Sequence, residues 1–159
     1  MTPRKELFIK VKEALATLTQ LELVDLQRAQ FSMPKENYPE FFTAALIDIK
    51  NIAWGTMVNQ RHEGAATIEV IFYCKDGWMD QYNNTADPEH GLIEIDILDL
   101  IEEKLQGLKG DSFRALDLEG EEALGADGEM MSYKLSFSTN IYKLVRPKYA
   151  GANIRPAQL

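Results

Sequence analysis

The chain has 159 residues, a formal net charge of −8 and 45% hydrophobic residues, so one domain can bury a core without a metal or a disulfide. Its single cysteine excludes an internal disulfide and favours a reducing compartment. The acidic balance argues against specific nucleic-acid binding, which depends on phosphate neutralisation, and no apolar run or N-terminal segment predicts a membrane span or a secretory signal.

The N-terminal segment predicts a helix over residues 3–18. Thr2 is a suitable N-cap, and Pro3 fits the first helical position. Apolar residues recur at helical spacing and predict one buried face, which consists of Leu7, Val11, Ala14, Leu15 and Leu18. A short strand is predicted over 21–27, followed by a loop rich in turn residues over 32–40.

A β-rich block follows, with a strand over 41–54 and a returning strand over 66–74. Residues 55–65 between them predict the turn region of a long hairpin, in which Gly64 is able to take a positive φ. The returning strand alternates, with Ile68, Val70, Phe72 and Cys74 on one face and Thr67, Glu69, Ile71 and Tyr73 on the other. The lone cysteine is therefore in register with three core-type residues.

A second amphipathic helix is predicted over residues 88–107, with Asp87 as its cap and Pro88 at its first position. Gly107 and Gly110 are suited to end it. Its expected apolar stripe is Ile93, Ile97, Ile101 and Leu105, and its opposite side carries Glu94, Asp96, Asp99, Glu102 and Glu103.

The last third predicts another hairpin, with a strand over 112–119, an acidic glycine-bearing loop over 120–129 and a strand over 130–142. In the last strand, one face is predicted to carry Met131, Tyr133, Leu135, Phe137 and Ile141, and the other face is rich in serine. This alternation predicts a sheet with one buried and one solvent-exposed face.

Together these elements predict an α+β fold in two layers. Two amphipathic helices would lie on one face of a mostly antiparallel sheet of four to five strands. We expect a single domain over 1–145 and a basic C-terminal tail over 146–159. From Lys143 onward the chain has four basic and no acidic residues, so the tail is either a solvated, disordered end or a segment that docks on an acidic neighbour.

Cys74 is the first candidate for chemistry, because a thiol with a nearby base can act as a nucleophile. The two histidines, His62 and His90, lie in predicted loops with no sequence signature that links them to Cys74. Since a free cysteine in phase with large apolar residues is most often a small buried hydrophobe, packing is the expected role.

Other chemistry finds equally little support in the sequence. One cysteine and two separated histidines cannot build a zinc site, and the oxygen-rich residues Asp80, Asn83, Asn84, Asp87 and Glu89 miss the calcium-loop spacing. The carboxylates of 117–129 are expected to be solvated, and no nucleotide-binding or hydrolase motif is present. Trp54, Trp78, Tyr82 and Tyr149 fit either a core or an interface. The sequence thus predicts no catalytic residue, no cofactor and no metal, and we expect a protein that is not an enzyme.

The order of elements resembles a known family. It includes Tyr38-Pro39, the strand AALIDI (44–49), the return GAATIEVIFYCKD (64–76), the helix end LIEEKLQGLKG (100–110) and the closing strand MSYKLSFSTNIY (131–142). Over about residues 3–145 this arrangement is similar to the small tail-terminator or tail-completion proteins of long-tailed phages, in their prophage form.

The resemblance implies a virion assembly subunit that forms a ring, commonly a hexamer, in the host cytoplasm and is then part of the virion tail. The ring would cap the tail tube and join it to the head-side connector, so the implied partners are other copies of the chain, the tail tube protein and the connector proteins. The family has no active site. We further expect the hairpins around 57–65 and 119–130 and the basic tail to contact neighbours, and the acidic helix face or the acidic segment 117–129 to line the channel.

Two alternatives stay open on the sequence alone. A small-molecule-binding or regulatory α+β domain would show a concave apolar pocket with converging polar groups, whereas a ring subunit would show a heterologous contact surface. A thiol enzyme would need an accessible Cys74.

Overall fold

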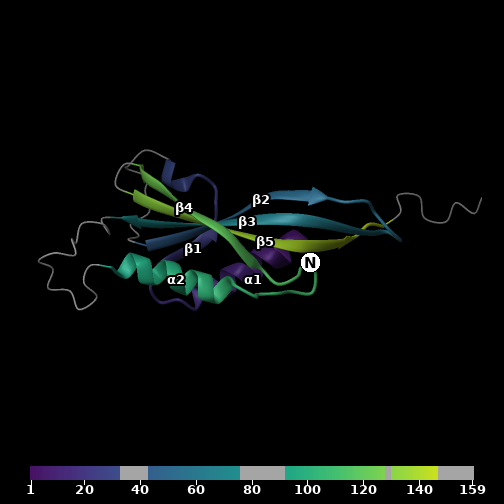
Figure 1. Ribbon diagram of the computed structural model, residues 1–159, viewed down its shortest axis with the longest axis horizontal. Helices are drawn as coiled ribbons and strands as arrows, with labels where there is room; N and C mark the ends of the chain where they lie inside the picture. The colour runs from purple at the N-terminus through teal and green to yellow at the C-terminus, as the bar shows by residue number, and fades with distance from the viewer. Residues whose placement is uncertain (33–42, 76–91, 128–129, 147–159) are drawn as a thin grey trace, which may run out of the picture.

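The computed structural model describes residues 1–32, 43–75, 92–127 and 130–146 (Figure 1). Its elements are α1 (Pro3–Ala16), β1 (Leu23–Leu26), the 3₁₀ turn η1 (Gln30–Ser32), β2 (Thr43–Trp54), β3 (Arg61–Lys75), α2 (Ile93–Leu105), β4 (Asp117–Asp127) and β5 (Met130–Leu144). One sheet holds five strands in the order β1-β2-β3-β5-β4. Only the β1–β2 pair is parallel, so the predicted α+β class and the mostly antiparallel sheet are confirmed.

Helix α1 begins as its sequence predicts. The Thr2 Oγ1 accepts a hydrogen bond from the Lys5 backbone N–H at 3.4 Å, and Pro3 occupies the first turn. The helix ends at Ala16, two residues before the predicted end, but Leu18 is still buried beyond it. The apolar stripe along α1 is therefore confirmed as the face that packs on the sheet.

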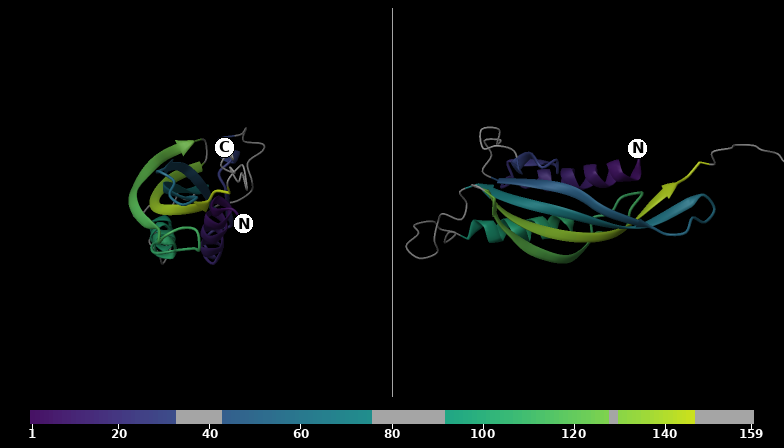
Figure 2. Two further views of the ribbon diagram at one scale, coloured as in Figure 1. Left: turned by 90° about the vertical axis from the view of Figure 1, so that its right-hand side faces the viewer. Right: turned by 90° about the horizontal axis from the view of Figure 1, so that it is seen from above.

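The main core lies between the sheet and both helices, which cover the same face (Figure 2). From the sheet it receives Ile68, Val70, Phe72 and Cys74 of β3 and Leu135, Phe137 and Ile141 of β5. From the helices it receives Leu7, Val11 and Leu15 of α1 and Ile97, Ile101 and Leu105 of α2. The predicted alternation is confirmed for β3 from Ala66 to Cys74 and for β5 from Tyr133 to Ile141; Met131, predicted on the same face, is not part of this core.

The other face of the sheet is not entirely solvent-exposed, and here the prediction of one wet face is wrong. A second, smaller cluster is buried there, made of Phe31, Ala44, Leu46 and Met130. The Phe31 and Tyr73 rings lie 4.7 Å apart between centroids. The cause is η1, which carries Phe31 onto β2 and β3 from outside the sheet.

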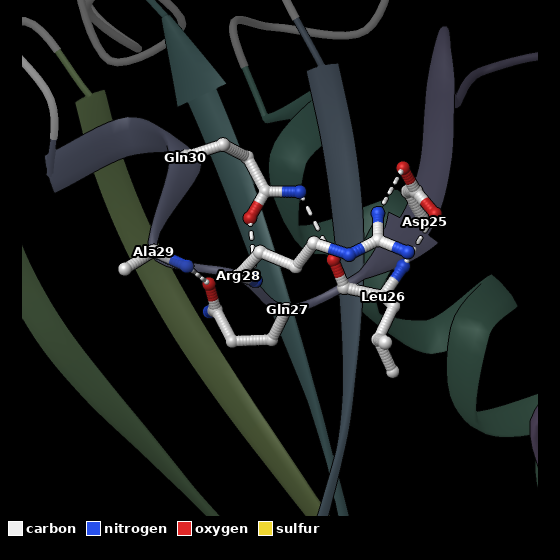
Figure 3. Close-up of polar contacts among 6 residues, drawn as sticks. All are labelled: Asp25, Leu26, Gln27, Arg28, Ala29 and Gln30. Carbon is white, nitrogen blue, oxygen red and sulfur yellow. Dashed lines mark hydrogen bonds and ion pairs between the residues drawn. The ribbon is translucent and has the colours of Figure 1, made fainter.

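The turn that delivers Phe31 is built from its own side chains (Figure 3). The Gln27 Oε1 accepts from the backbone N–H of Ala29, which holds a positive φ of 56°, and the Gln30 Nε2 donates to the Leu26 carbonyl at 2.9 Å. The Arg28 Nη1 lies 3.3 Å from the Asp25 Oδ2. These polar groups hydrogen-bond to one another and so stabilise the turn that ends β1. We therefore assign them a structural role.

The β2–β3 hairpin turns more tightly than predicted, since β3 begins at Arg61 inside the expected turn region. Val58 and Arg61 exchange backbone hydrogen bonds of 3.0 and 2.8 Å around Asn59 and Gln60, whose φ values are 49° and 62°. Positive φ at both central positions is typical of the two-residue turns that match the twist of a hairpin. The positive φ expected at Gly64 therefore belongs to these two residues.

Gly64 instead provides room inside the strand. A Cβ added there would lie 2.7 Å from the Ile52 Cγ2 and 2.8 Å from the Trp54 Cε3. We expect Gly64→Ala to destabilise the protein by about 1–3 kcal/mol through overpacking, measured by urea unfolding. Gly120→Ala is the matched control, because nothing lies within 4 Å of its added Cβ. Equal stability of the two variants would contradict the steric role of Gly64.

Helix α2 starts later than predicted. Leu92 precedes it with the non-helical φ of −114°, and none of the described side chains caps the helix. Asp87 and Pro88, the predicted cap and first residue, lie outside the described residues. Within the expected apolar stripe Ile93 is exposed, while Glu94 is buried in its place. Ile97, Ile101 and Leu105 of the stripe are buried as predicted, so only the first turn of the helix presents apolar side chains to solvent.

The predicted acidic loop 120–129 is mostly a strand. Glu121 and Glu122 lie in β4, which pairs with β5 along its length through two register shifts, the second of them beside Gly125 with φ of 81°. Residues 112–116 are not a strand; Phe113 makes one isolated bridge to Ile141. β4 forms despite the low strand propensity of glycine and glutamate, because its backbone pairs with β5. As an edge strand, β4 also leaves the glutamate side chains in water.

Candidate interaction surfaces

The lone cysteine lies in the main core and not in a cleft. Cys74 is buried on the helix-covered face of β3, opposite Met131 of β5. His62 lies twelve residues away along the same strand, a separation on the order of 40 Å. The two residues that a thiol mechanism would pair are therefore far apart, and His90 lies outside the described residues.

The other residues that the sequence raised as candidates for chemistry lie either on the edge strand β4 or outside the described residues. No group of three or more His, Cys, Asp or Glu able to hold a metal is found in the described part of the chain. The segment with Asp80 and Asn83 lies outside it, as do Trp78, Tyr82 and Tyr149. Asp117, Glu119, Glu121 and Glu122 are all exposed along β4, as expected of solvated carboxylates.

A network of charges crosses the face of the sheet that the helices leave open. The buried Glu69 carboxylate of β3 lies 2.9 Å from the Lys50 Nζ and 3.4 Å from the Lys134 Nζ. Lys134 also lies 3.3 Å from Glu122 of β4. The hydrogen bond to Glu122 and the charge of Glu69 raise the pKa of Lys134. A lysine held protonated in this way is unsuited to act as a base, so the network compensates a buried carboxylate.

Three strands extend beyond the rest of the sheet as an arm, defined here as residues 52–64 and 140–146. β1 pairs with β2 only as far as Ile47, and β4 pairs with β5 only as far as Ser138. Beyond these points β2, β3 and β5 continue side by side, and the hairpin end projects past the N-terminus of α1 (Figures 1 and 2).

The base of the arm is fixed by a cluster of cationic side chains around one indole. The Trp54 ring stacks on His62 at 4.9 Å between centroids. The Lys143 Nζ lies 4.9 Å and the Arg4 Cζ 5.8 Å from the same ring, so β2, β3, β5 and α1 all contribute. Cation–π contacts of this kind stabilise the arrangement and give this end of the molecule a positive surface.

The arm tip is apolar and exposed. Met57, Val58 and Leu144 have exposed fractions between 48% and 75%, and Leu144 is held beside the turn because the Val145 N–H donates to the Gln60 carbonyl at 2.8 Å. Exposed basic residues, Arg61 and Arg146, flank these side chains. We call Met57, Val58, Leu144, Arg61 and Arg146 the arm-tip patch. Exposed apolar clusters rimmed by polar groups mark interaction sites.

A second exposed apolar cluster lies at the first turn of α2. Leu92, Ile93 and Ile95 have exposed fractions between 39% and 55%, and the exposed carboxylates of Asp96 and Asp99 follow them. We call these five residues the helix-start patch. Along the longest axis of the molecule it lies at the end opposite to the arm tip (Figure 1). The sequence did not reveal it, because Ile93 has the spacing of the predicted buried stripe and Ile95 is a single apolar residue outside that stripe.

Two hollows on the described surface are open, and polar and apolar atoms line each of them about equally. One of about 380 Å³ lies where β3, β5 and the segment before β4 meet, and it includes Thr67, Arg114, Asp117, Ser138 and Asn140. The other, of about 440 Å³, lies at the arm tip beside Val58 and Leu144. Neither is the concave apolar pocket that a small-molecule-binding domain would show.

Neither described helix is long and apolar enough to cross a membrane.

No protein-family model and no curated protein matches the chain. Among solved structures, it is similar to a chain of a particle titled "Virion of native gene transfer agent (GTA) particle". The TM-score is 0.59 at 12% sequence identity, and the match covers 88% of this chain and 97% of that chain. The two chains therefore share a fold over nearly their whole length.

Proposed function

We propose that the protein is a structural component of a phage-like virion. The observation that carries this proposal is the fold shared with a virion chain over 97% of that chain, together with the order of elements that resembles tail terminators. The finer proposal is a ring-forming subunit, a hexamer in the assembled tail, that caps the tail tube and joins it to the head-side connector. Its partners would be other copies of itself, the tail tube protein and the connector proteins.

We propose that the protein is not an enzyme. Cys74 is buried in the main core, and Glu122 and Glu69 raise the pKa of Lys134, which favours its protonated form. The small-molecule alternative would need an enclosed apolar pocket, whereas the two hollows found among the described residues are open and lined equally by polar and apolar atoms. Host-cytoplasmic assembly and later residence in the virion tail follow from the proposed role.

The acidic edge of the sheet fits the lumen of such a ring. Glu119, Glu121 and Glu122 of β4 are exposed on an edge strand. Carboxylates there would repel DNA phosphates, so DNA would pass without binding. In this proposal β4 lines the channel. The sequence alone had left the acidic face of the second helix as an equally good candidate. The docking of the basic tail 146–159 stays a prediction; its residues 147–159 lie outside the described part.

The proposal predicts where the protein is found. Purified protein carrying a gold label, mixed with tail tubes of the same particle, is expected to bind one end of each tube, as seen by negative-stain electron microscopy. Particles from a strain that lacks the protein are expected to show heads and tails that are not joined. Label spread along the tube, or normal joined particles without the protein, would contradict the capping role.

A further inference from the structure

We infer that the arm-tip patch of one copy binds the helix-start patch of a second copy. This inference rests on the proposed ring-forming role and deepens it, because it names the two surfaces that meet. Both patches expose three large apolar side chains to water within the described chain. Burying such side chains is favourable at about 25 cal/mol per Å², so each patch gains from an apolar partner.

The charges around the two patches are complementary. Arg61 and Arg146 flank the arm tip, and the Trp54 cluster adds Arg4 and Lys143 behind it, so the cations outnumber the one exposed carboxylate beside them, Glu63. Asp96 and Asp99 flank the exposed isoleucines of α2. An apolar centre with opposite charges at its rim is the usual composition of a protein–protein contact. A nucleic acid would match the basic rim but not the apolar centre, and it is an outcome that the test below separates.

The positions of the patches determine the kind of assembly. They are different surfaces at opposite ends of the longest axis, so each copy can bind one neighbour with its arm and another with its helix (Figure 1). Such a head-to-tail contact repeats and generates either a closed ring or an open chain. A contact of this kind is what a ring subunit requires, whereas a symmetric dimer would use one patch twice.

The arm is ordered before it binds. Asn59 and Gln60 form a tight turn, Leu144 is held by the Val145–Gln60 hydrogen bond, and the indole of Trp54 is packed against His62 and two cations. A partner that meets this surface does not have to order it, which lowers the entropic cost of association. A rigid projection also fixes the direction of the neighbour, which a closed ring needs.

Directed cross-linking tests the contact. Val58→Cys and Ile95→Cys place one thiol in each patch, and the native Cys74 is buried. Mixing the two variants at high protein concentration with a short bis-maleimide is expected to give a covalent dimer, at least tenfold above either variant alone. Val58→Cys mixed with Glu103→Cys is the matched control, since Glu103 is exposed on α2 away from its first turn. Equal yields in both mixtures, or dimers of Val58→Cys alone, would overturn the inference.

Charge exchange provides a second readout. Arg61→Glu in the Val58→Cys chain is expected to lower the dimer yield about fivefold, and Asp96→Arg in the Ile95→Cys chain is expected to restore it. Added DNA should leave the yield unchanged; loss of the dimer with DNA bound to the arm would assign the patch to nucleic acid and overturn the inference.

The double variant Val58→Cys/Ile95→Cys separates this inference from the proposed function. It is expected to give a ladder of covalent oligomers that ends at the ring size. Rings on the tube end without this ladder would refute the paired patches and leave the ring proposal standing. A ladder that continues without an end, with no protein on the tube, would confirm the contact and refute the capping ring.

Discussion

Replacing Ile101 by aspartate is expected to unfold the protein at room temperature. Its side chain is fully buried on α2, between Ile97 and Leu105, in the main core. The change removes a large apolar side chain and buries a carboxylate without a designed partner, which together cost about 4–5 kcal/mol or more. That loss is comparable with the total stability of many domains. Far-ultraviolet circular dichroism and urea unfolding would measure it.

Ile95→Asp is the matched control, because it makes the same chemical change six residues earlier on the same helix. Ile95 is exposed in the helix-start patch, so the unfolding free energy of the Ile95→Asp variant should stay within about 0.5 kcal/mol of that of the wild type. The same variant should lose binding to the arm tip. Strong destabilisation by Ile95→Asp would show that the first turn of α2 is buried and would refute both the fold assignment and the patch.

The parts of the fold that the sequence predicted correctly are those with strong periodicity. The stripe of Leu7, Val11 and Leu15 and the alternation through Phe72 and Phe137 both report a single buried face. Hydrophobic burial is the dominant favourable term in folding, so such patterns survive in the tertiary structure. The placement of Cys74 in the core was predicted for the same reason, because it follows the alternation of β3.

The parts that were missed depend on long-range pairing. β4 has a composition typical of a loop, with Gly120, Gly125 and several glutamates, and only its pairing with β5 makes it a strand. The second cluster around Phe31 depends on a turn whose side chains satisfy one another. Local sequence propensity predicts neither β4 nor the Phe31 cluster, because both arise from contacts between residues far apart or from side-chain geometry.

The candidate surfaces were predicted only in part. The hairpin around 57–65 was expected to reach past the core, and the arm does so. The cluster that supports it could not be read from the sequence, because Arg4, Trp54, His62 and Lys143 meet only through the register of three strands and the start of α1. Ile93 is exposed at the start of α2 and Glu94 is buried there, although Ile97, Ile101 and Leu105 lie in the core. Spacing alone does not determine which side chains of a first turn are covered.

A carboxylate on α1 joins the two halves of the fold. The Glu6 Oε1 accepts from the backbone N–H of Asp111 at 2.6 Å, and its Oε2 accepts from the backbone N–H of Ser112 at 3.0 Å and from the Ser112 hydroxyl. These bonds attach the segment between α2 and β4 to the N-terminal helix, more than one hundred residues away in sequence. Gly110 lies against the same carboxylate, since a Cβ there would be 2.6 Å from its Oε1.

Glu6→Ala is expected to destabilise the protein by about 2–4 kcal/mol at neutral pH. It removes hydrogen bonds to a charged acceptor, each of which contributes about 1.5–3 kcal/mol, and it leaves donors at Asp111 and Ser112 unpaired. Glu6→Gln should cost less, because one amide oxygen can still accept. Glu13→Gln, exposed on the same helix, is the control and should change little. An effect of Glu6→Ala no larger than that of the control would show that the segment is held without this carboxylate.

The same carboxylate gives the stability a defined dependence on pH. Burial alone would raise the pKa of Glu6, but the hydrogen bonds from Ser112 and Asp111 and the charge of Lys10 lower it below 4.5. A folded pKa below the unfolded one contributes stability above about pH 4.5, and this contribution is lost as pH falls through the folded pKa. The difference in unfolding free energy between wild type and Glu6→Gln should therefore decrease as the pH falls below about 4.5. A difference that stays constant down to pH 2–3 would show that the ionised form of Glu6 is not what holds the segment, because protonation would then leave the attachment intact.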